Sequence, residues 1–134
     1  MASLDDPGVR LLLEQQVNHA VLSTFDPDGS VHSAVVWVDV VEGRIAVNSA
    51  VGRRWPTNLE RDPRLTVLVY DETNPYDYVE VKGSVTSTTD GADAHIDRLA
   101  KKYLGVDSYP FRTDGEQRIS FFLEPTRVRH QKQG

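Results

Sequence analysis

The 134-residue sequence contains no cysteine, so disulfide bonds, thiolate nucleophiles and zinc sites built on thiolates are excluded. It has no run of about eighteen apolar residues, and it does not begin with a basic stretch followed by an apolar one. We therefore expect neither a membrane-spanning nor a targeting segment, and a cytoplasmic protein. Acidic residues outnumber basic ones, 20 to 15, and the net charge of −5 disfavours a general nucleic-acid binder, which needs a basic face.

Signatures of several common enzyme classes are missing as well. The sequence has no G-x-S-x-G motif, no G-x-x-x-x-G-K-[ST] loop and no G-x-G-x-x-G loop, which disfavours a hydrolase, an ATPase and a Rossmann dehydrogenase. The four histidines, His19, His32, His95 and His130, lack the spacing of a metal site, so we predict no bound metal. His32, close to a predicted turn, is instead a candidate ligand contact.

The sequence does contain enough apolar material for one folded domain over residues 1–134. Thirty-nine per cent of the residues are hydrophobic, and a chain of this length buries roughly two thirds of its unfolded surface. Alternating apolar and polar residues predict short strands, and 3.6-residue patterns predict two longer helices. The strands are expected at 21–25, 31–41, 44–49, 65–70, 76–88 and 118–123, the helices near 7–18 and 90–105, and a short helix before Asp62-Pro63.

Local signals refine this outline. Gly83 lies inside an alternating run and predicts a bulge or a sharp bend, which helps a sheet to close. Pro125 is expected to end the last clear strand, with a few more paired residues possible at 128–130. Because strands dominate and the connections are tight, we expect a mainly β, α+β fold: an antiparallel barrel with helices at its ends.

A candidate anion site follows the strand that ends at Ser49. Gly52 turns the chain and places Arg53 and Arg54 at the first turn of a short helix, where Pro56 is also well tolerated. Free backbone N–H groups and the helix dipole favour a bound phosphate there, and guanidinium groups add charge and paired donors. The alternative is a solvated arginine pair at the start of a surface helix.

A second candidate feature is the strand face that carries Trp37. A tryptophan in the middle of a strand is most often a core residue. Here the same face holds Ser33 and Asp39, and the neighbouring strand ends in Asn48-Ser49. Small polar groups beside a flat aromatic ring are suited to bind a planar heterocycle, with the two arginines available for its phosphate. The two features together predict a flavin-like or nucleotide-like cofactor.

Several segments resemble the split-barrel flavin and deazaflavin proteins of the pyridoxamine 5′-phosphate oxidase-like superfamily. They are Asp28–His32 (DGSVH) and the run from Asn48 to Arg64, which contains GRRWP and ends in DPR. The runs Asn74–Gly83 and His95–Phe111, the latter with LGVD and YPF, are similar to the branch that uses the deazaflavin coenzyme F420, common in actinobacteria. The resemblance covers about residues 12–128.

The resemblance implies a six-stranded antiparallel split β-barrel that forms a homodimer, with a cofactor in each of two grooves at the interface. Ser49, Gly52, Arg53 and Arg54 would hold the phosphate, and the strand from His32 to Trp37 would pass beneath the ring. The full set of implied cofactor-binding residues is His32, Ser33, Ala34, Val35, Val36, Trp37, Asn48, Ser49, Gly52, Arg53, Arg54, Trp55, Thr57 and Asn58, with Tyr76, Asp77 and Tyr78 contributed by the other subunit. Trp55 stands where many relatives have a lysine.

The activity implied is hydride transfer between reduced F420 and a small electron-poor organic substrate. A cofactor of this kind carries the difficult chemistry, so the protein needs no catalytic dyad. Tyr109 is a candidate proton donor. Two alternatives stay open: an FMN-dependent oxidoreductase of the same fold, and a protein that binds F420 or another ligand without turnover.

Overall fold

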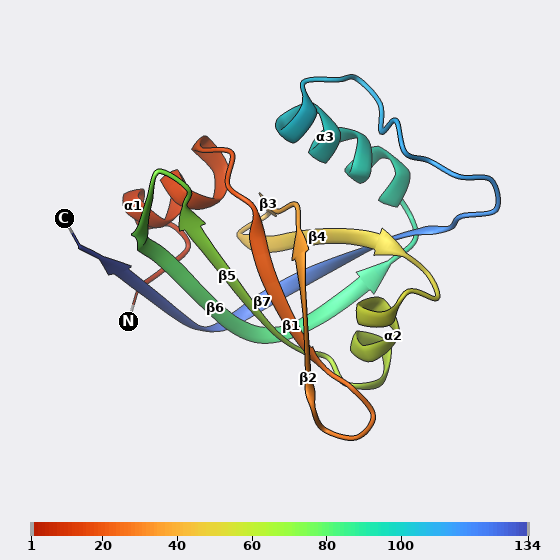
Figure 1. Cartoon of the computed structure of the whole chain (residues 1–134), viewed down its shortest axis with the longest axis horizontal. Coiled ribbons are helices and arrows are strands. Elements are labelled where there is room, and N and C mark those ends of the chain that lie inside the picture. The colour runs from red at the N-terminus through yellow and green to blue at the C-terminus, as the bar shows by residue number, and fades with distance from the viewer. Residues whose placement is uncertain (1, 134) are drawn as a thin grey trace.

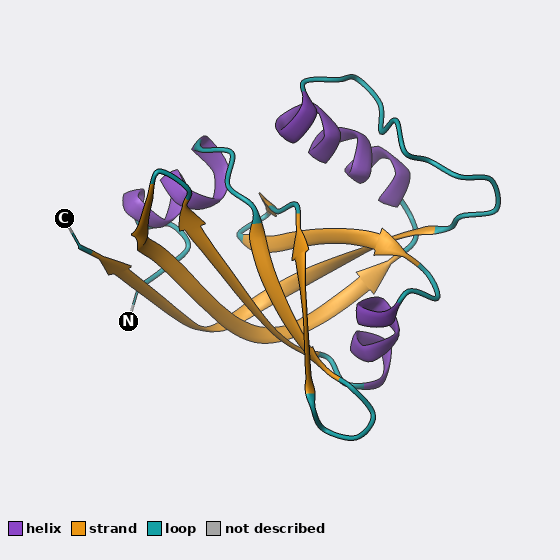
Figure 2. Ribbon diagram, in the orientation of Figure 1, coloured by secondary structure: helices purple, strands orange, loops and turns teal. Residues whose placement is uncertain are grey.

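The computed structural model describes residues 2–133, and its strands form a single antiparallel sheet that curls around a core (Figures 1 and 2). The strands, in chain order, are β1 (Ala20–Phe25), β2 (Val31–Val36), β3 (Asp39–Val41), β4 (Arg44–Ala50), β5 (Arg64–Asp71), β6 (Asn74–Thr88) and β7 (Arg118–Lys132). The helices are α1 (Pro7–Arg10), which continues as a π-helical segment over Leu11–Gln15, α2 (Arg54–Arg61) and α3 (Ala92–Leu104). The expected mainly β fold is confirmed.

The sheet has seven strands among the described residues, in the order β2-β1-β5-β6-β7-β4-β3. The six strands that the resemblance implies are therefore one too few, whereas the sequence pattern itself predicted six or seven. The two edge strands, β2 and β3, follow one another in the chain, so the chain itself passes from one edge of the sheet to the other. The barrel is split at this place: the two edges are joined by the chain but not by a hydrogen-bonded ladder.

The split comes from two residues, Trp37 and Val38, that interrupt the predicted strand 31–41. The N–H of Val38 donates to the Tyr103 hydroxyl (3.1 Å), and its carbonyl accepts from Lys102 Nζ (2.7 Å). Trp37 stacks on the Tyr103 ring, with 5.3 Å between ring centroids. Side chains of α3 thus satisfy the main-chain groups of Val38, and no strand within residues 2–133 pairs with this segment.

The inner face of the sheet carries the core. Fully buried side chains include Leu22, Val47, Val67 and Phe121, and the first helical segment covers one end of the sheet with Leu12 and Leu13. In β2 the expected alternation holds, since its even-numbered residues are half-buried and its odd-numbered residues exposed.

Gly83 produces the predicted irregularity in β6, and the reason is steric. The register of β6 against β7 shifts between Lys82 and Gly83, and a Cβ at position 83 would overlap the carbonyl oxygen of Glu124. Pro125 lies opposite Gly83 at this irregularity, where its missing N–H interrupts no regular ladder. The strand therefore continues to Lys132, and the expectation that Pro125 ends it is wrong.

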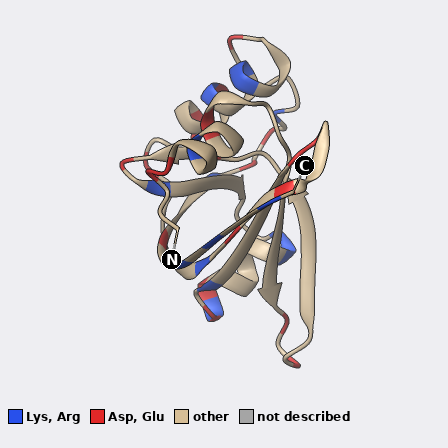
Figure 3. Cartoon of the chain, turned by 90° about the vertical axis from the view of Figure 1, so that its left-hand side faces the viewer, with Lys and Arg blue, Asp and Glu red and all other residues tan. Residues whose placement is uncertain are grey.

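The surface carries charges of both signs. Figure 3 shows basic and acidic positions interspersed over the helices and the sheet. Among residues 2–133, every helix is too short or too polar to span a membrane.

Candidate functional site

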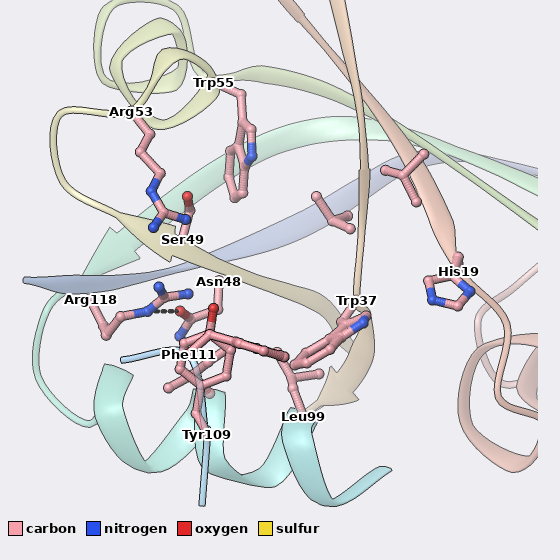
Figure 4. Close-up of a pocket in the computed structure, with 13 residues that line it drawn as sticks. His19, Trp37, Asn48, Ser49, Arg53, Trp55, Leu99, Tyr109, Phe111 and Arg118 are labelled. Atoms are coloured by element: carbon pink, nitrogen blue, oxygen red, sulfur yellow. Dashed lines mark hydrogen bonds between the residues drawn. The ribbon is translucent and has the colours of Figure 1, made fainter. Parts of the chain in front are cut away.

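A cavity of about 240 Å³ lies between β2, β4, α3 and the loop that leads from α3 to β7 (Figure 4). Its lining falls into two parts: polar side chains from the ends of β4 and β7, and apolar or aromatic side chains from β2, α3 and the loop. The lining residues are His19, Val35, Val36, Trp37, Asn48, Ser49, Arg53, Trp55, Ile96, Leu99, Tyr109, Phe111 and Arg118.

The turn between β4 and α2 places Arg53 at the polar end. Gly52 has φ of 94°, a conformation that residues with a side chain rarely adopt, and it sends the chain back toward the sheet. Arg53 follows with extended backbone as the N-cap of α2, and Pro56 lies within the first turn as predicted. In Figure 4 the Arg53 side chain extends from the start of α2 toward Ser49.

The centre of the polar end is a buried arginine, Arg118, at the start of β7. Its Nε donates to Oδ1 of Asn48 (2.9 Å), and its Nη1 pairs with Oε1 of Glu116 (3.0 Å). The other carboxylate oxygen of Glu116 pairs with Nη2 of Arg53 (3.1 Å). The side chains of Arg118 and Glu116 are only 3% and 4% exposed. One carboxylate thus lies between two guanidinium groups.

Asn48 is held in one orientation by a buried network. Its amide donates to the carbonyl of Ala92 (2.9 Å) and lies 3.2 Å from the Ser120 hydroxyl. Ser120 in turn contacts Nδ1 of His95 (2.7 Å), whose Nε2 lies 3.1 Å from Asp39. Serine, histidine and aspartate in this order are typical of a hydrolase, but Ser120 and His95 are both buried. The network therefore positions the Asn48 oxygen toward Arg118.

The other end of the cavity is aromatic. Trp37 stacks on Tyr103 and meets the edge of Tyr109, with 6.1 Å between those ring centroids. Phe111 contacts Tyr109 in the same edge-on manner (5.7 Å), and the Arg118 guanidinium carbon lies 5.1 Å from the centre of the Tyr109 ring. Burial raises the pKa of Tyr103 to about 12, so this hydroxyl stays protonated and keeps its hydrogen bonds.

Arg54 lies elsewhere. It makes two hydrogen bonds to the carboxylate of Asp26, of 3.1 and 2.7 Å, and lines a separate depression with Thr57 and Asn58. The Arg54 guanidinium, assisted by the Asn58 amide, holds the pKa of Asp26 well below its usual range. The structure therefore does not bring the two adjacent arginines to one point, because Arg54 is bound to the β1–β2 turn.

The other predicted site residues are also divided. Val35 and Val36 line the cavity, whereas His32, Ser33 and Ala34 do not. Trp55 lines the cavity but is mostly buried against Phe121.

The three residues assigned to the other subunit lie outside the cavity of their own chain. Tyr76 is exposed, Tyr78 is half-buried, and buried Asp77 contacts His130 (2.8 Å). Their contribution to a partner's site stays a prediction.

Some lining residues were not among those predicted: His19, Ile96, Leu99, Phe111 and Arg118. The one signal for Arg118 in the sequence is a charged residue that directly precedes the apolar run Ile119–Leu123. Its position beside Asn48 depends on the pairing of β7 with β4, in which Ala50 lies opposite Arg118. This long-range pairing has no local sequence signal.

The family model for pyridoxamine 5′-phosphate oxidase matches residues 8–132. Among solved structures, the chain is similar to an F420 reductase, with 26% identity, a TM-score of 0.79, and coverage of 90% of this chain and 94% of that one. A conserved hypothetical protein from Mycobacterium tuberculosis is 23% identical, with a TM-score of 0.65 and coverage of 84% and 76%.

A third similar structure is an FMN-binding protein from Nostoc punctiforme that is related to pyridoxamine 5′-phosphate oxidase. It is 11% identical, with a TM-score of 0.60 and coverage of 84% of this chain and 72% of that one. No curated protein matches the chain. Because the family model covers most of the sequence, the chain belongs to the pyridoxamine 5′-phosphate oxidase family of split-barrel, flavin-binding oxidoreductases.

Proposed function

We propose that this member of the family is an F420-dependent oxidoreductase that transfers a hydride between the reduced coenzyme and a small electron-poor substrate. The observation that carries the proposal is the two-part cavity: guanidinium donors of Arg53 and Arg118 line one part, and the aromatic part runs from Tyr109, which lies against Arg118, to Trp37. The likeness to an F420 reductase at 26% identity supports the deazaflavin over other flat cofactors.

The residues present fit such a cofactor. Arg118 donates hydrogen bonds to protein groups through Nε and Nη1, and Nη2 has no protein acceptor among residues 2–133. An anionic phosphate that meets Arg118 and Arg53 gains charge-assisted hydrogen bonds. Trp37 and Val35 offer a flat apolar surface for a ring. When bound, the reduced deazaflavin supplies a hydride.

The protein then contributes binding, orientation and exclusion of water. Asn48 and Glu116 fix the Arg118 guanidinium, while Ile96 and Leu99 of α3 keep the inner wall of the cavity apolar. Tyr109 lines the same cavity and is the candidate to deliver a proton from its hydroxyl. Tyr109→Phe is expected to slow turnover without weakening coenzyme binding.

The site is proposed to be completed by a second subunit. Its volume of about 240 Å³ is less than the roughly 300 Å³ at which small-molecule pockets begin. Large apolar side chains around it and along β2 are exposed, among them Val31, Val35 and Phe111. Sedimentation equilibrium is expected to give twice the chain mass, and a monomer at micromolar concentration would contradict this.

Fluorescence offers a direct test of coenzyme binding, because the two tryptophans of the chain, Trp37 and Trp55, both line the cavity. F420 is expected to quench their emission at micromolar concentration, with most of the change lost in Trp37→Phe. Absent quenching together with tight FMN binding would overturn the assignment in favour of FMN, the alternative cofactor.

Turnover separates an enzyme from a carrier. Reduced F420 is mixed with the protein and a panel of activated alkenes and quinones, and oxidation of the coenzyme is followed by absorbance. An enzyme oxidises the coenzyme in the presence of an acceptor, whereas a carrier binds it and leaves it reduced.

A further inference from the structure

We propose that Glu116 makes the cavity select a phosphate diester, which carries one negative charge, over a phosphate monoester, which carries nearly two. This inference rests on the proposed function, in which a cofactor phosphate meets Arg53 and Arg118. It concerns a residue that belongs to neither the predicted site nor the cavity lining.

The geometry behind the proposal is the shared carboxylate. Oε1 of Glu116 pairs with Arg118 (3.0 Å) and Oε2 pairs with Arg53 (3.1 Å). A further hydrogen bond to Oε2 comes from the Thr113 hydroxyl (3.3 Å). The Glu116 side chain is therefore fixed, and it is almost fully buried. It lies behind the polar end of the cavity while both of its partners line it.

The cluster of Arg53, Arg118 and Glu116 has a net charge of +1. Two guanidinium groups and one carboxylate leave a single net positive charge at the polar end. A ligand with one negative charge neutralises it. A second negative charge is attracted only in proportion, whereas the cost of desolvating the ligand rises with the square of its charge, and Glu116, which repels the second charge, leaves that cost uncompensated. Because the cluster is largely buried, this repulsion is screened less than it would be at the surface.

Phosphate monoesters and diesters differ in the charge that they bring to this cluster. A monoester has a second pKa near 6, so it carries about −1.5 to −2 at pH 7. A diester carries one charge at any pH near neutrality. The phosphate of F420 is a diester, because the coenzyme tail is attached to it, and that of FMN is a monoester. Glu116 thereby favours the tailed deazaflavin over FMN at the same arginines.

Two probes that differ by about one charge test the proposal: 5-deazariboflavin as its 5′-phosphate and as its 5′-(methyl phosphate). Dissociation constants are measured by tryptophan quenching for the wild type, Glu116→Gln and the control Glu42→Gln. Glu42 lies at the β3–β4 turn with an 81% exposed side chain, so its variant removes the same formal charge away from the cluster. Thermal unfolding verifies that each variant is folded.

The wild type is expected to bind the diester more tightly. In Glu116→Gln the monoester gains about tenfold in affinity and the diester about threefold, because each ligand charge experiences the same reduction in repulsion. Glu42→Gln leaves both constants unchanged. Equal gains for both probes, or no gain, would overturn the proposal. If the wild type binds neither probe, the proposed function fails and the charge selection fails with it.

A second variant keeps the test independent of the stability of Glu116→Gln. Arg53 is half exposed, and its loss leaves the pair of Arg118 and Glu116 intact. Arg53→Gln removes one positive charge, so the monoester is expected to lose about the square of the factor that the diester loses. A loss of equal size for both probes contradicts the charge-based selection.

Discussion

Two arginine–carboxylate pairs flank the start of α2, and they differ in burial rather than in chemistry. In one, Arg118 and Glu116 are both buried, and an asparagine, Asn48, accepts a further hydrogen bond. In the other, Arg54 is 64% exposed, Asp26 is 12% exposed, and another asparagine, Asn58, contributes to the pair. The buried pair directs donors into a cavity, and the exposed pair attaches the β1–β2 turn to α2.

The comparison shows that the place of a charge in the fold decides its use. An exposed pair in water contributes little to stability, because solvent and salt screen it. A buried pair is costly to desolvate and is tolerated only when the groups shielded from solvent have partners, and Asn48, Glu116 and Arg53 provide these partners. Donors left over in such a place are available to a ligand.

The largest expected effect is the loss of stability in Arg118→Met, which disrupts the buried pair. Removing this guanidinium leaves Glu116 buried with only Arg53 as its cation, and the free energy of unfolding is expected to fall by about 3 to 5 kcal/mol. Chemical denaturation measures the loss. The double variant Arg118→Met with Glu116→Met is expected to recover most of the stability but not coenzyme binding. If Arg118→Met lowers the free energy of unfolding as little as Arg54→Ala does, the proposed difference between the buried and the exposed pair is contradicted.

Arg53→Ala is expected to affect binding more than folding. Arg53 is half exposed, and its guanidinium is proposed to meet the ligand anion. The free energy of coenzyme binding should weaken by roughly 1.5 to 3 kcal/mol, the range for a hydrogen bond between charged groups. Fluorescence titration measures the affinity and thermal unfolding the stability. A collapse of the melting temperature with unchanged affinity would make Arg53 a structural residue.

Arg54→Ala provides the matched comparison, since it removes the same side chain one residue later. Its donors are bound by Asp26 outside the cavity, so coenzyme affinity is expected to stay unchanged and the melting temperature to fall slightly. Fluorescence titration with the coenzyme measures the affinity of this variant. If Arg54→Ala weakens binding as much as Arg53→Ala, the two neighbours share one anion, as the sequence suggested.

The smallest effect concerns pH. Because Arg54 lowers the pKa of Asp26 in the folded protein, the carboxylate stabilises the fold above its unfolded pKa near 4, and this contribution is lost as the pH falls further. Wild type and Asp26→Asn are therefore expected to differ most in melting temperature at pH 7, and the difference is expected to shrink steadily below about pH 4, toward the strongly lowered pKa of the folded state. A difference in melting temperature of constant size from pH 7 down to about pH 2 would mean that the charge of Asp26 makes no contribution.

Much of the fold follows from local patterns. The turn at Asp26–Gly29, the bulge at Gly83 and the helix before Gly105 each depend on neighbouring residues, and each was predicted. The break at Trp37–Val38 was missed because the apolar alternation continues through it. Its cause is a pair of side chains on α3, far along the sequence.

The site was predicted less completely, for a related reason. Asn48, Ser49, Arg53 and Trp37 lie within or next to recognisable strands and turns, and the structure places all four at the cavity. Arg53 is the N-cap of α2 with extended backbone, whereas Arg54 is the first helical residue, so their side chains separate although they are adjacent in sequence. Arg118 reaches the cavity only through the pairing of β7 with β4.

The interruption at Val38 links the edge of the sheet to access to the cavity. Lys102 and Tyr103 hold this residue from the same helix whose Ile96 and Leu99 form the cavity wall. A fluctuation that lifts α3 is thus expected to widen the cavity and to free the Val38 amide at the same moment. Hydrogen–deuterium exchange at this one amide would report how often the protein opens, and a bound coenzyme that holds α3 down would slow it.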